Sequence, residues 1–198
     1  LGDDSRIAHC TANENGDEGF DIGRLSHAAH CIANRNGRNG FLIDDDTLVI
    51  DCAASVNAAD GFNADTGVRI ERCLSSQNGS NGMDVNERCT VINCTVDWND
   101  MAGIGTDQSW CRFIGNTITR HSFMGASGIF ISGSQSVVDG NTISEVAIGI
   151  NISAGTRNCV MRNRITGFTT SVTAPANNDV APVTNTFTGA GPWDNLAD

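Results

Sequence analysis

The acidic residues that could do chemistry recur along the middle of the chain. Asp44, Asp65, Asp84 and Asp107 follow one another at intervals of 19 to 23 residues. Carboxylates stacked near each other repel and raise each other's pKa unless a cation compensates. Such a group could bind calcium, which takes roughly six to eight oxygen ligands, or supply the acid and base of glycoside hydrolysis. It could equally begin turns and keep the protein soluble, so all three interpretations stay open.

The residues that must position these carboxylates repeat with a strict period. Cysteine, asparagine and glycine each return every 21 residues, at Cys10, Cys31, Cys52, Cys73 and Cys94, at Asn15, Asn36, Asn57, Asn78 and Asn99, and at Gly19, Gly40, Gly61, Gly82 and Gly103. A repeat of this length is typical of a solenoid. Leucine is scarce, while glycine, asparagine and β-branched residues dominate, which favours short strands joined by tight turns. The sequence therefore predicts one all-β domain, a parallel β-helix of about nine coils of about 21 residues.

The alternation of side chains along a strand predicts which residues face inward and which outward. In the first coil Ile7, Cys10, Ala12, Phe20 and Ile22 would face the core. The outward positions of the strand that follows each glycine are then Asp21, Leu42, Asn63, Asp84, Gly105, Phe130 and Asn151, and one strand step later come Asp44, Asp65, Asn86 and Asp107. We predict Asp65 and Asp84 as the catalytic pair if the protein is an enzyme, and as the ligands if it binds calcium. Asp44, Asn63, Asp107 and Phe130 are the predicted substrate-binding residues.

Composition excludes several classes of function. The formal charge is −11, and the sequence contains neither lysine nor tyrosine. An acidic surface argues against nucleic-acid binding, because phosphate contacts need a cationic face. No apolar run reaches about 20 residues, so membrane insertion is not expected. We expect that the protein requires no cofactor, and calcium is the one ion that it could bind.

The eight cysteines are interpreted as free thiols. Five occupy one repeating position, where a small buried side chain suits a free thiol, and in-register parallel side chains point the same way instead of toward each other. Metal binding by the cysteines is not expected, since no Cys-x-x-Cys pair occurs.

Aromatic and histidine side chains give weaker signals. The one sizeable irregularity of the repeat, residues 120–127, contains Phe123 and Met124. Together with Trp98, Trp110 and Phe130 these side chains could stack on sugar rings or could pack against the solenoid. His9 and His30 lie one coil apart, but the same position later holds Asp51, Arg72 and Asn93, which indicates surface residues.

Several short motifs resemble one known group of repeat proteins. Gly115-Asn116-Thr117-Ile118 and Gly140-Asn141-Thr142-Ile143, with Asn93-Cys94-Thr95 and Asp60-Gly61-Phe62, resemble the right-handed parallel β-helix repeats of bacterial members of the pectin-lyase-like superfamily. The resemblance implies a secreted or cell-surface protein. It also implies coils over residues 1–173 and a capping segment over residues 174–198, in which Trp193 would cover the last coil. Because Ile7 is already in register, we expect further coils before Leu1.

The same resemblance suggests an enzyme that acts on polysaccharides, and the composition limits which reactions it could catalyse. Lyases of this group use a lysine or arginine base, and lysine is absent; the epimerase type of site needs a tyrosine, which is also absent. Of the hydrolase motifs only Asp44-Asp45-Asp46 gives a loose echo. We therefore predict a non-catalytic extracellular or cell-surface domain that binds polysaccharide or another surface component. The alternatives are a polysaccharide hydrolase or lyase with an acidic groove, and a structural spacer whose copies join through the flank or the ends.

Overall fold

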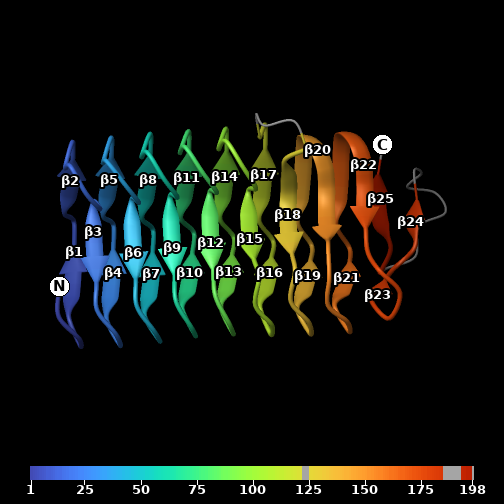
Figure 1. Ribbon diagram of the computed structural model, residues 1–198, viewed down its shortest axis with the longest axis horizontal. Coiled ribbons are helices and arrows are strands. Elements are labelled where there is room, and N and C mark those ends of the chain that lie inside the picture. The colour runs from blue at the N-terminus through green and yellow to red at the C-terminus, as the bar shows by residue number, and fades with distance from the viewer. Residues whose placement is uncertain (122–124, 185–192, 198) are drawn as a thin grey trace.

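The chain winds into a right-handed parallel β-helix, as the sequence predicts (Figure 1). The structure is a computed structural model that describes residues 1–121, 125–184 and 193–197. Successive coils stack along one axis, with the N-terminus at one end of the stack, and every strand pair among the described residues is parallel. No described segment is a helix long and apolar enough to cross a membrane.

One face of the solenoid is a sheet of nine strands, one from each coil. In spatial order these are β1 (Arg6–Ala8), β4 (His27–Ala29), β7 (Leu48–Ile50), β10 (Arg69–Glu71), β13 (Thr90–Ile92), β16 (Arg112–Ile114), β19 (Val137–Asp139), β21 (Cys159–Met161) and β23 (Asp179–Val180).

The second sheet has 16 strands in all, including three off its main path, and covers the two other faces. One face holds β2 (Thr11–Asn13), β5 (Ile32–Asn34), β8 (Ala53–Ser55), β11 (Leu74–Ser76), β14 (Thr95–Asp97) and β17 (Thr117–Thr119). The other holds β3 (Phe20–Ile22), β6 (Phe41–Ile43), β9 (Phe62–Ala64), β12 (Met83–Val85), β15 (Ile104–Thr106) and β18 (Ser127–Ile131). The long strands β20 (Thr142–Ile152) and β22 (Arg164–Thr173) run through both faces and join them.

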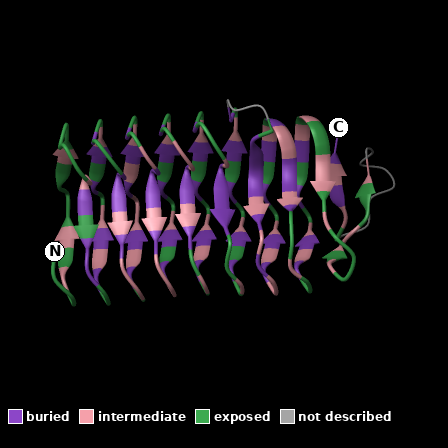
Figure 2. Ribbon diagram, in the orientation of Figure 1, coloured by how far each residue is buried: buried purple, intermediate pink, exposed green. Residues whose placement is uncertain are grey.

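The core is a set of stacked rows that run along the axis. Within most strands a buried residue alternates with a more exposed one, so the interior is continuous from coil to coil (Figure 2). Phe20, Phe41 and Phe62 stack with ring centroids 5.0 and 4.8 Å apart. Ile7 and Ala12, in the first coil, are only partly buried. The inward positions predicted for Phe20 and Ile22 are thus confirmed, whereas Cys10, also predicted to face the core, is exposed in the first coil.

Three bends per coil separate the faces, and each is a single residue with positive φ. One row of bends contains His9, His30, Asp51 and Arg72, and another contains Glu14, Arg35, Val56 and Trp98, all with φ between 51° and 57°. Side chains other than glycine adopt this backbone at a cost. In the second of these rows the left-handed residue is the one before each repeating asparagine.

The asparagine row holds the coils together through side-chain hydrogen bonds, as expected. Asn57 Oδ1 accepts from the backbone N–H of Asn36 at 3.1 Å and from its Nδ2 at 2.9 Å. Asn57 Nδ2 donates to Ala33 O and to Asn78 Oδ1. Asn36, Asn57, Asn78 and Asn99 are all buried. These asparagines are part of the scaffold.

The cysteine row does the same work at another corner. Cys52 Sγ accepts from the N–H of Cys31 at 3.4 Å and donates to Ile50 O at 3.3 Å. All eight cysteines are free, as expected; Cys10 is exposed, Cys159 is partly exposed and the other six are buried. After Cys94 an asparagine takes the position of the cysteine in the row: the N–H of Cys94 donates to Asn116 Oδ1.

The described parts of the C-terminal segment continue both sheets. β23 pairs with β21, and β25 (Asn195–Ala197) pairs with β22 and with β24 (Val183–Thr184). Asn195 Oδ1 accepts from Asn163 N, which extends the asparagine positions into this segment. Trp193 lies beside Arg162, whose guanidinium is 5.1 Å from the ring centroid, and 58% of Trp193 is exposed.

We predict that Asn57→Ala destabilises the protein by about 2 to 4 kcal/mol, because it leaves the buried N–H groups of Asn36 without an acceptor. Urea denaturation followed by circular dichroism measures this. Asn13→Ala, an exposed asparagine on β2, is the matched control and should change the free energy of unfolding by no more than about 0.5 kcal/mol. Equal effects of the two variants would contradict a structural role for the row.

We also predict that only Cys10 and Cys159 react rapidly with a thiol reagent in the native protein, because the other six thiols are buried. All eight should react in denaturant. Mass spectrometry of the labelled peptides identifies the sites, and rapid labelling of Cys52 or Cys73 in the native protein would contradict this arrangement.

Candidate ligand-binding cavity

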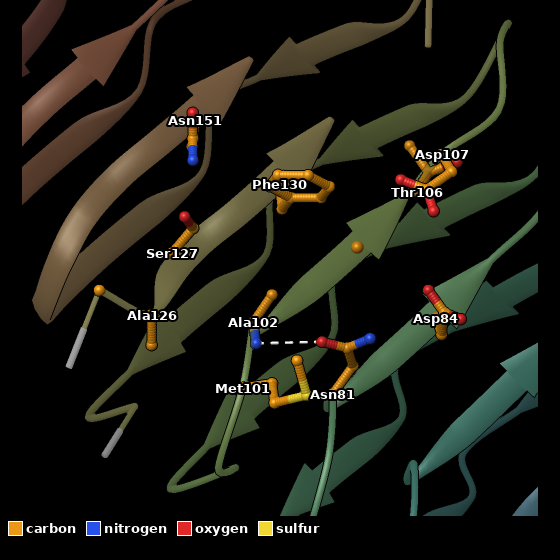
Figure 3. A pocket seen from close by; sticks show the side chains of 12 residues that line it. Asn81, Asp84, Met101, Ala102, Thr106, Asp107, Ala126, Ser127, Phe130 and Asn151 are labelled. Carbon is orange, nitrogen blue, oxygen red and sulfur yellow. Dashed lines mark hydrogen bonds between the residues drawn. The ribbon is translucent and has the colours of Figure 1, made fainter. Parts of the chain in front are cut away.

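A cavity of about 420 Å³ opens on the outer face of β12, β15 and β18 (Figure 3). This volume falls within the range of small-molecule sites, roughly 300 to 1,000 Å³. The residues that line the cavity are mostly polar or small: Asn81, Asp84, Met101, Ala102, Gly105, Thr106, Asp107, Gly125, Ala126, Ser127, Phe130 and Asn151.

The floor of the cavity is the outward row of residues that the sequence predicts. Strand pairing places Asp84 beside Gly105, Gly105 beside Phe130, and Phe130 beside Asn151. A Cβ added to Gly105 would lie 3.5 Å from Asp84 Oδ1 and 3.6 Å from Asn81 Nδ2, which is ordinary van der Waals contact. The missing side chain of Gly105 thus leaves a hollow between a carboxylate, an amide and an aromatic ring.

Asn81 is held in one orientation by the backbone. Its Oδ1 accepts from the N–H of Ala102 at 3.0 Å, as the dashed line in Figure 3 shows. Its own N–H donates to Asp60 Oδ1 at 2.8 Å, and the N–H of Asp60 donates to Asn39 Oδ1 at 3.0 Å. This row of side chains ends at Ala102, which has no polar atom to continue it. Because Oδ1 of Asn81 is engaged, Nδ2 is the end of the amide that faces the hollow.

Asp84 is the most perturbed carboxyl of the cavity. Partial burial, with smaller contributions from the charges of Asp60 and Asp107, raises the pKa of Asp84 to about 6. Asp60 uses both of its oxygens as acceptors, Oδ1 for Asn81 N and Oδ2 for Asn63 Nδ2. Asp84 and Asp107 make no hydrogen bond or ion pair with any described residue. Both carboxylates therefore remain available to a ligand.

Only some of the predicted site residues meet here. Asp84, Asp107 and Phe130 line the cavity, while Asp44, Asp65 and Asn63 do not. Asp65 Oδ1 accepts from Asn86 Nδ2 at 2.8 Å, in the neighbouring row.

Asp44 and Asp65 interact with each other instead. Burial, together with the charges of Asp65 and Asp21, raises the pKa of Asp44. The charges that act on Asp84 come from Asp60 and Asp107, so Asp84 has Asp107 and not Asp65 as its partner within the cavity.

The aromatic side chains also divide. Trp98 and Trp110 are about half exposed and do not line the cavity, and the guanidinium of Arg120 lies 5.6 Å from the ring centroid of Trp98. Phe123 and Met124 lie outside the described residues. Phe130 is therefore the aromatic ring of the cavity among the residues that the structure describes.

The sequence reasoning missed Asn81, which shapes the hollow together with Asp84. A signal was present, because a polar residue precedes the glycine in Asn39-Gly40, Asp60-Gly61 and Asn81-Gly82. These polar residues recur with the period of the repeat and form a row that ends at Ala102.

No group of three or more histidine, cysteine, aspartate or glutamate side chains lies so that it could hold a metal ion, within the part of the chain that the structure describes. His9 and His30 stack as expected from the repeat, with ring centroids 4.9 Å apart.

The fold and the outer-face cavity define a parallel β-helix protein with a concave site on its flank. Residues 29–190 match the model of a family described as "Periplasmic copper-binding protein (NosD)". The match covers well over half of the chain, so the chain belongs to the NosD family. No curated protein matches it significantly in sequence.

Solved structures with a similar fold are enzymes by their descriptions. The A-module of mannuronan C-5 epimerase AlgE4 from Azotobacter vinelandii superposes with a TM-score of 0.82 at 18% identity, covering 89% of this chain and 57% of that one. A glycoside hydrolase gives 0.67 at 11% identity over 91% and 38% of the two chains. Pectate lyase Pel9A gives 0.56 at 14% identity over 82% and 55%. At these identities the similarity shows the fold alone, and the chain spans little more than half of the epimerase module.

The described residues do not fit a copper site of three or more ligands. Copper favours thiolate, thioether and imidazole donors, and no suitable cluster of histidine, cysteine or carboxylate side chains is found among the described residues. The thiols of the cysteine row already take part in hydrogen bonds with the backbone. Burial raises the pKa of the Cys31, Cys73 and Cys89 thiols, which disfavours their thiolates, whereas hydrogen bonding with Cys73 lowers the pKa of Cys52 and Cys94.

We predict that Asp84→Asn stabilises the protein above about pH 6. The folded protein binds the proton of Asp84 more tightly than the unfolded chain, so this group lowers stability as pH rises from about 4 to about 6. The variant lacks this loss and should gain about 1 to 3 kcal/mol at neutral pH. Thermal denaturation across this pH range measures the effect.

Asp4→Asn is the matched control, because Asp4 is an exposed aspartate of the first coil, outside the cavity. It should change the free energy of unfolding at neutral pH by no more than about 0.5 kcal/mol. A parallel pH dependence of the wild type and Asp84→Asn would show that Asp84 titrates normally.

Proposed function

We propose that this chain is a polysaccharide-binding β-helix domain that works outside the cytoplasm, and that it binds a sugar residue in the Gly105 cavity. The observation that carries the proposal is the cavity itself, in which a hollow over Gly105 is flanked by Asp84, Asn81 and Phe130. Sugar sites in proteins combine an aromatic platform with a few polar groups that fix orientation.

The family description and the structures of similar fold support the general role, but they identify neither a ligand nor a site for this chain. The NosD family is described as periplasmic and copper-binding, and the structures of similar fold are described as an epimerase, a glycoside hydrolase and a pectate lyase. Those descriptions belong to the other proteins. What they share with this chain is a β-helix scaffold, whose stacked coils suit an extended polymer.

Binding without catalysis is the function we favour. The chain has neither lysine nor tyrosine, so it lacks two residue types that could act as base or acid, and no histidine lines the cavity among the described residues. One observation favours hydrolysis as the second candidate: a carboxyl with a pKa of about 6 suits a general acid, and Asp107 would be its partner.

We predict that Phe130→Ala weakens polysaccharide binding at least about tenfold, because truncating a central aromatic side chain removes most of the stacking contact. Affinity electrophoresis against a panel of neutral, amino and uronate polysaccharides measures this. Trp110→Ala is the matched control, since Trp110 is an exposed aromatic residue outside the cavity. Retention by none of the polymers would refute the proposed function.

The same incubations distinguish binding from hydrolysis. The size distribution of each polymer is measured after long exposure to the protein, with and without calcium. Unchanged size together with retention supports a binding domain. Shortening of a polymer that is abolished in Asp84→Asn would assign hydrolysis to the cavity instead.

A further inference from the structure

We propose that the Gly105 cavity selects a sugar residue with a free amine, so that its polymer is a de-N-acetylated hexosamine chain and not a polyuronate. This inference rests on the proposed function and names the substrate class of the same site. The ammonium group would lie over Gly105, between the carboxylate of Asp84 and the ring of Phe130 (Figure 3).

The charge of the cavity is uncompensated. Among the described residues its lining contains two carboxylates, Asp84 and Asp107, and no arginine or histidine. A uronate would bring a third carboxylate into this space, and like charges at short range repel. An ammonium group would neutralise the charge that is already there.

Some aspartates elsewhere in the protein are paired with arginines from the next coil. Arg72 Nε lies 2.9 Å from Asp51 Oδ1, and Arg120 Nη2 lies 2.8 Å from Asp97 Oδ2. Arg162 and Asp139 form a third pair of this kind. In the next coil the position of Asp84 is Gly105, which offers no cation. Asp84 thus has open space beside it in the next coil, where these aspartates have an arginine.

The polar groups around the hollow match an amino alcohol. When it is ionised, the Asp84 carboxylate only accepts hydrogen bonds, and an ammonium group only donates them. Asn81 Nδ2 is a donor whose orientation is fixed by the bond from Ala102 N to Asn81 Oδ1. A hydroxyl oxygen next to the amine on the sugar ring could accept from it. Both groups lie at nearly equal distance from the empty Cβ position of Gly105.

Phe130 adds an apolar and cation-attracting surface on the other side of Gly105. An aromatic face within about 6 Å attracts an ammonium group and also packs against the C–H face of a sugar ring. An acetylated amine keeps the packing but loses the charge. The amine is therefore the feature that the cavity distinguishes.

A calcium ion is a weaker occupant of the same space. Calcium takes roughly six to eight oxygen ligands, and the described residues contain no group of three or more carboxylates, histidines or cysteines placed to hold a metal. An organic cation needs one or two charged partners and a surface to pack on, which Asp84, Asp107 and Phe130 supply.

Isothermal titration calorimetry with three tetramers tests the inference: glucosamine, N-acetylglucosamine and galacturonic acid, each in calcium and in EDTA. A pH of about 6.5 keeps an amine of ordinary basicity charged and a carboxyl with a pKa of about 6 mostly ionised. We expect the glucosamine tetramer to bind at least about tenfold more tightly than its acetylated form, because its hydrogen bond to Asp84 is charge-assisted. The uronate tetramer should not bind measurably.

Two variants locate the effect. Asp84→Asn keeps the shape of the side chain and should lower the affinity for the glucosamine tetramer to that for the acetylated tetramer, with Asp21→Asn as the control. Gly105→Ala fills the hollow at ordinary contact distances and should abolish binding of both. Gly16→Ala, where an added Cβ meets nothing within 4 Å, is the control for that change.

The outcomes separate the inference from the proposed function. Equal affinity for the charged and acetylated tetramers, or tighter binding of the uronate with or without calcium, overturns the selection of an amine and leaves polysaccharide binding in place. Failure of all three tetramers, while another polymer of the electrophoresis panel is retained, also overturns it. Retention of no polymer at all refutes the proposed function and the inference together.

Discussion

Backbone N–H groups at the corners of each coil need acceptors, and the rest of the structure depends on how they find them. At a bend the chain leaves one sheet face before it joins the next, so strand pairing does not reach every donor. The next coil supplies a side chain instead: Asn57 Oδ1 for Asn36 N, Cys52 Sγ for Cys31 N, and Thr47 Oγ1 for Ser26 N. A buried donor without an acceptor costs about 1 to 3 kcal/mol, so each coil fixes the register of its neighbour.

This constraint explains why unlike residues occupy one row. The cysteine position is taken over by asparagine when the N–H of Cys94 donates to Asn116 Oδ1 and that of Asn116 donates to Asn141 Oδ1. Another row passes from Ser26 and Thr47 to Ser136 and finally to asparagine, as Ser136 N donates to Asn158 Oδ1. Apart from Val68, which follows Thr47 in the second row, what recurs is a small side chain with an acceptor. Neither redox nor metal chemistry is needed to account for the repeated thiols.

The fold could be predicted from the sequence because the strict period places equivalent residues at the same position of successive coils. The alternation of side chains then placed Asp84, Gly105 and Phe130 in one outward line, which strand pairing confirms. The bends were harder to predict from the sequence, because many side chains are tolerated at the left-handed position once the neighbouring coils hold it. Residues as different as Val56 and Trp98 occupy it, so residue type carries little information there.

The composition of the cavity was harder to predict for a related reason. Spacing along the sequence puts Asp65 and Asp84 near each other, but Asp65 belongs to the preceding coil and Asn86 donates to it. Asp107, from the following coil, is the carboxylate that reaches the cavity. The hollow exists because Gly105 has no side chain and Ala102 has no polar side-chain atom. Residues that lack a chemical group do not stand out in a sequence as functional residues do.

A repeat this regular makes every coil alike, so a specific site requires a place where the repeat changes. That place lies between β15 and β18, where the step from Ile104 to its partner Ile129 spans 25 residues instead of 21. The supporting rows continue across the change: Gly103 N still donates to Ser127 O, and Cys111 N donates to Ser136 Oγ. Because these buried bonds do not involve Asp84, Asp107 or Phe130, the outer residues can determine which ligand binds without disturbing the scaffold beneath them.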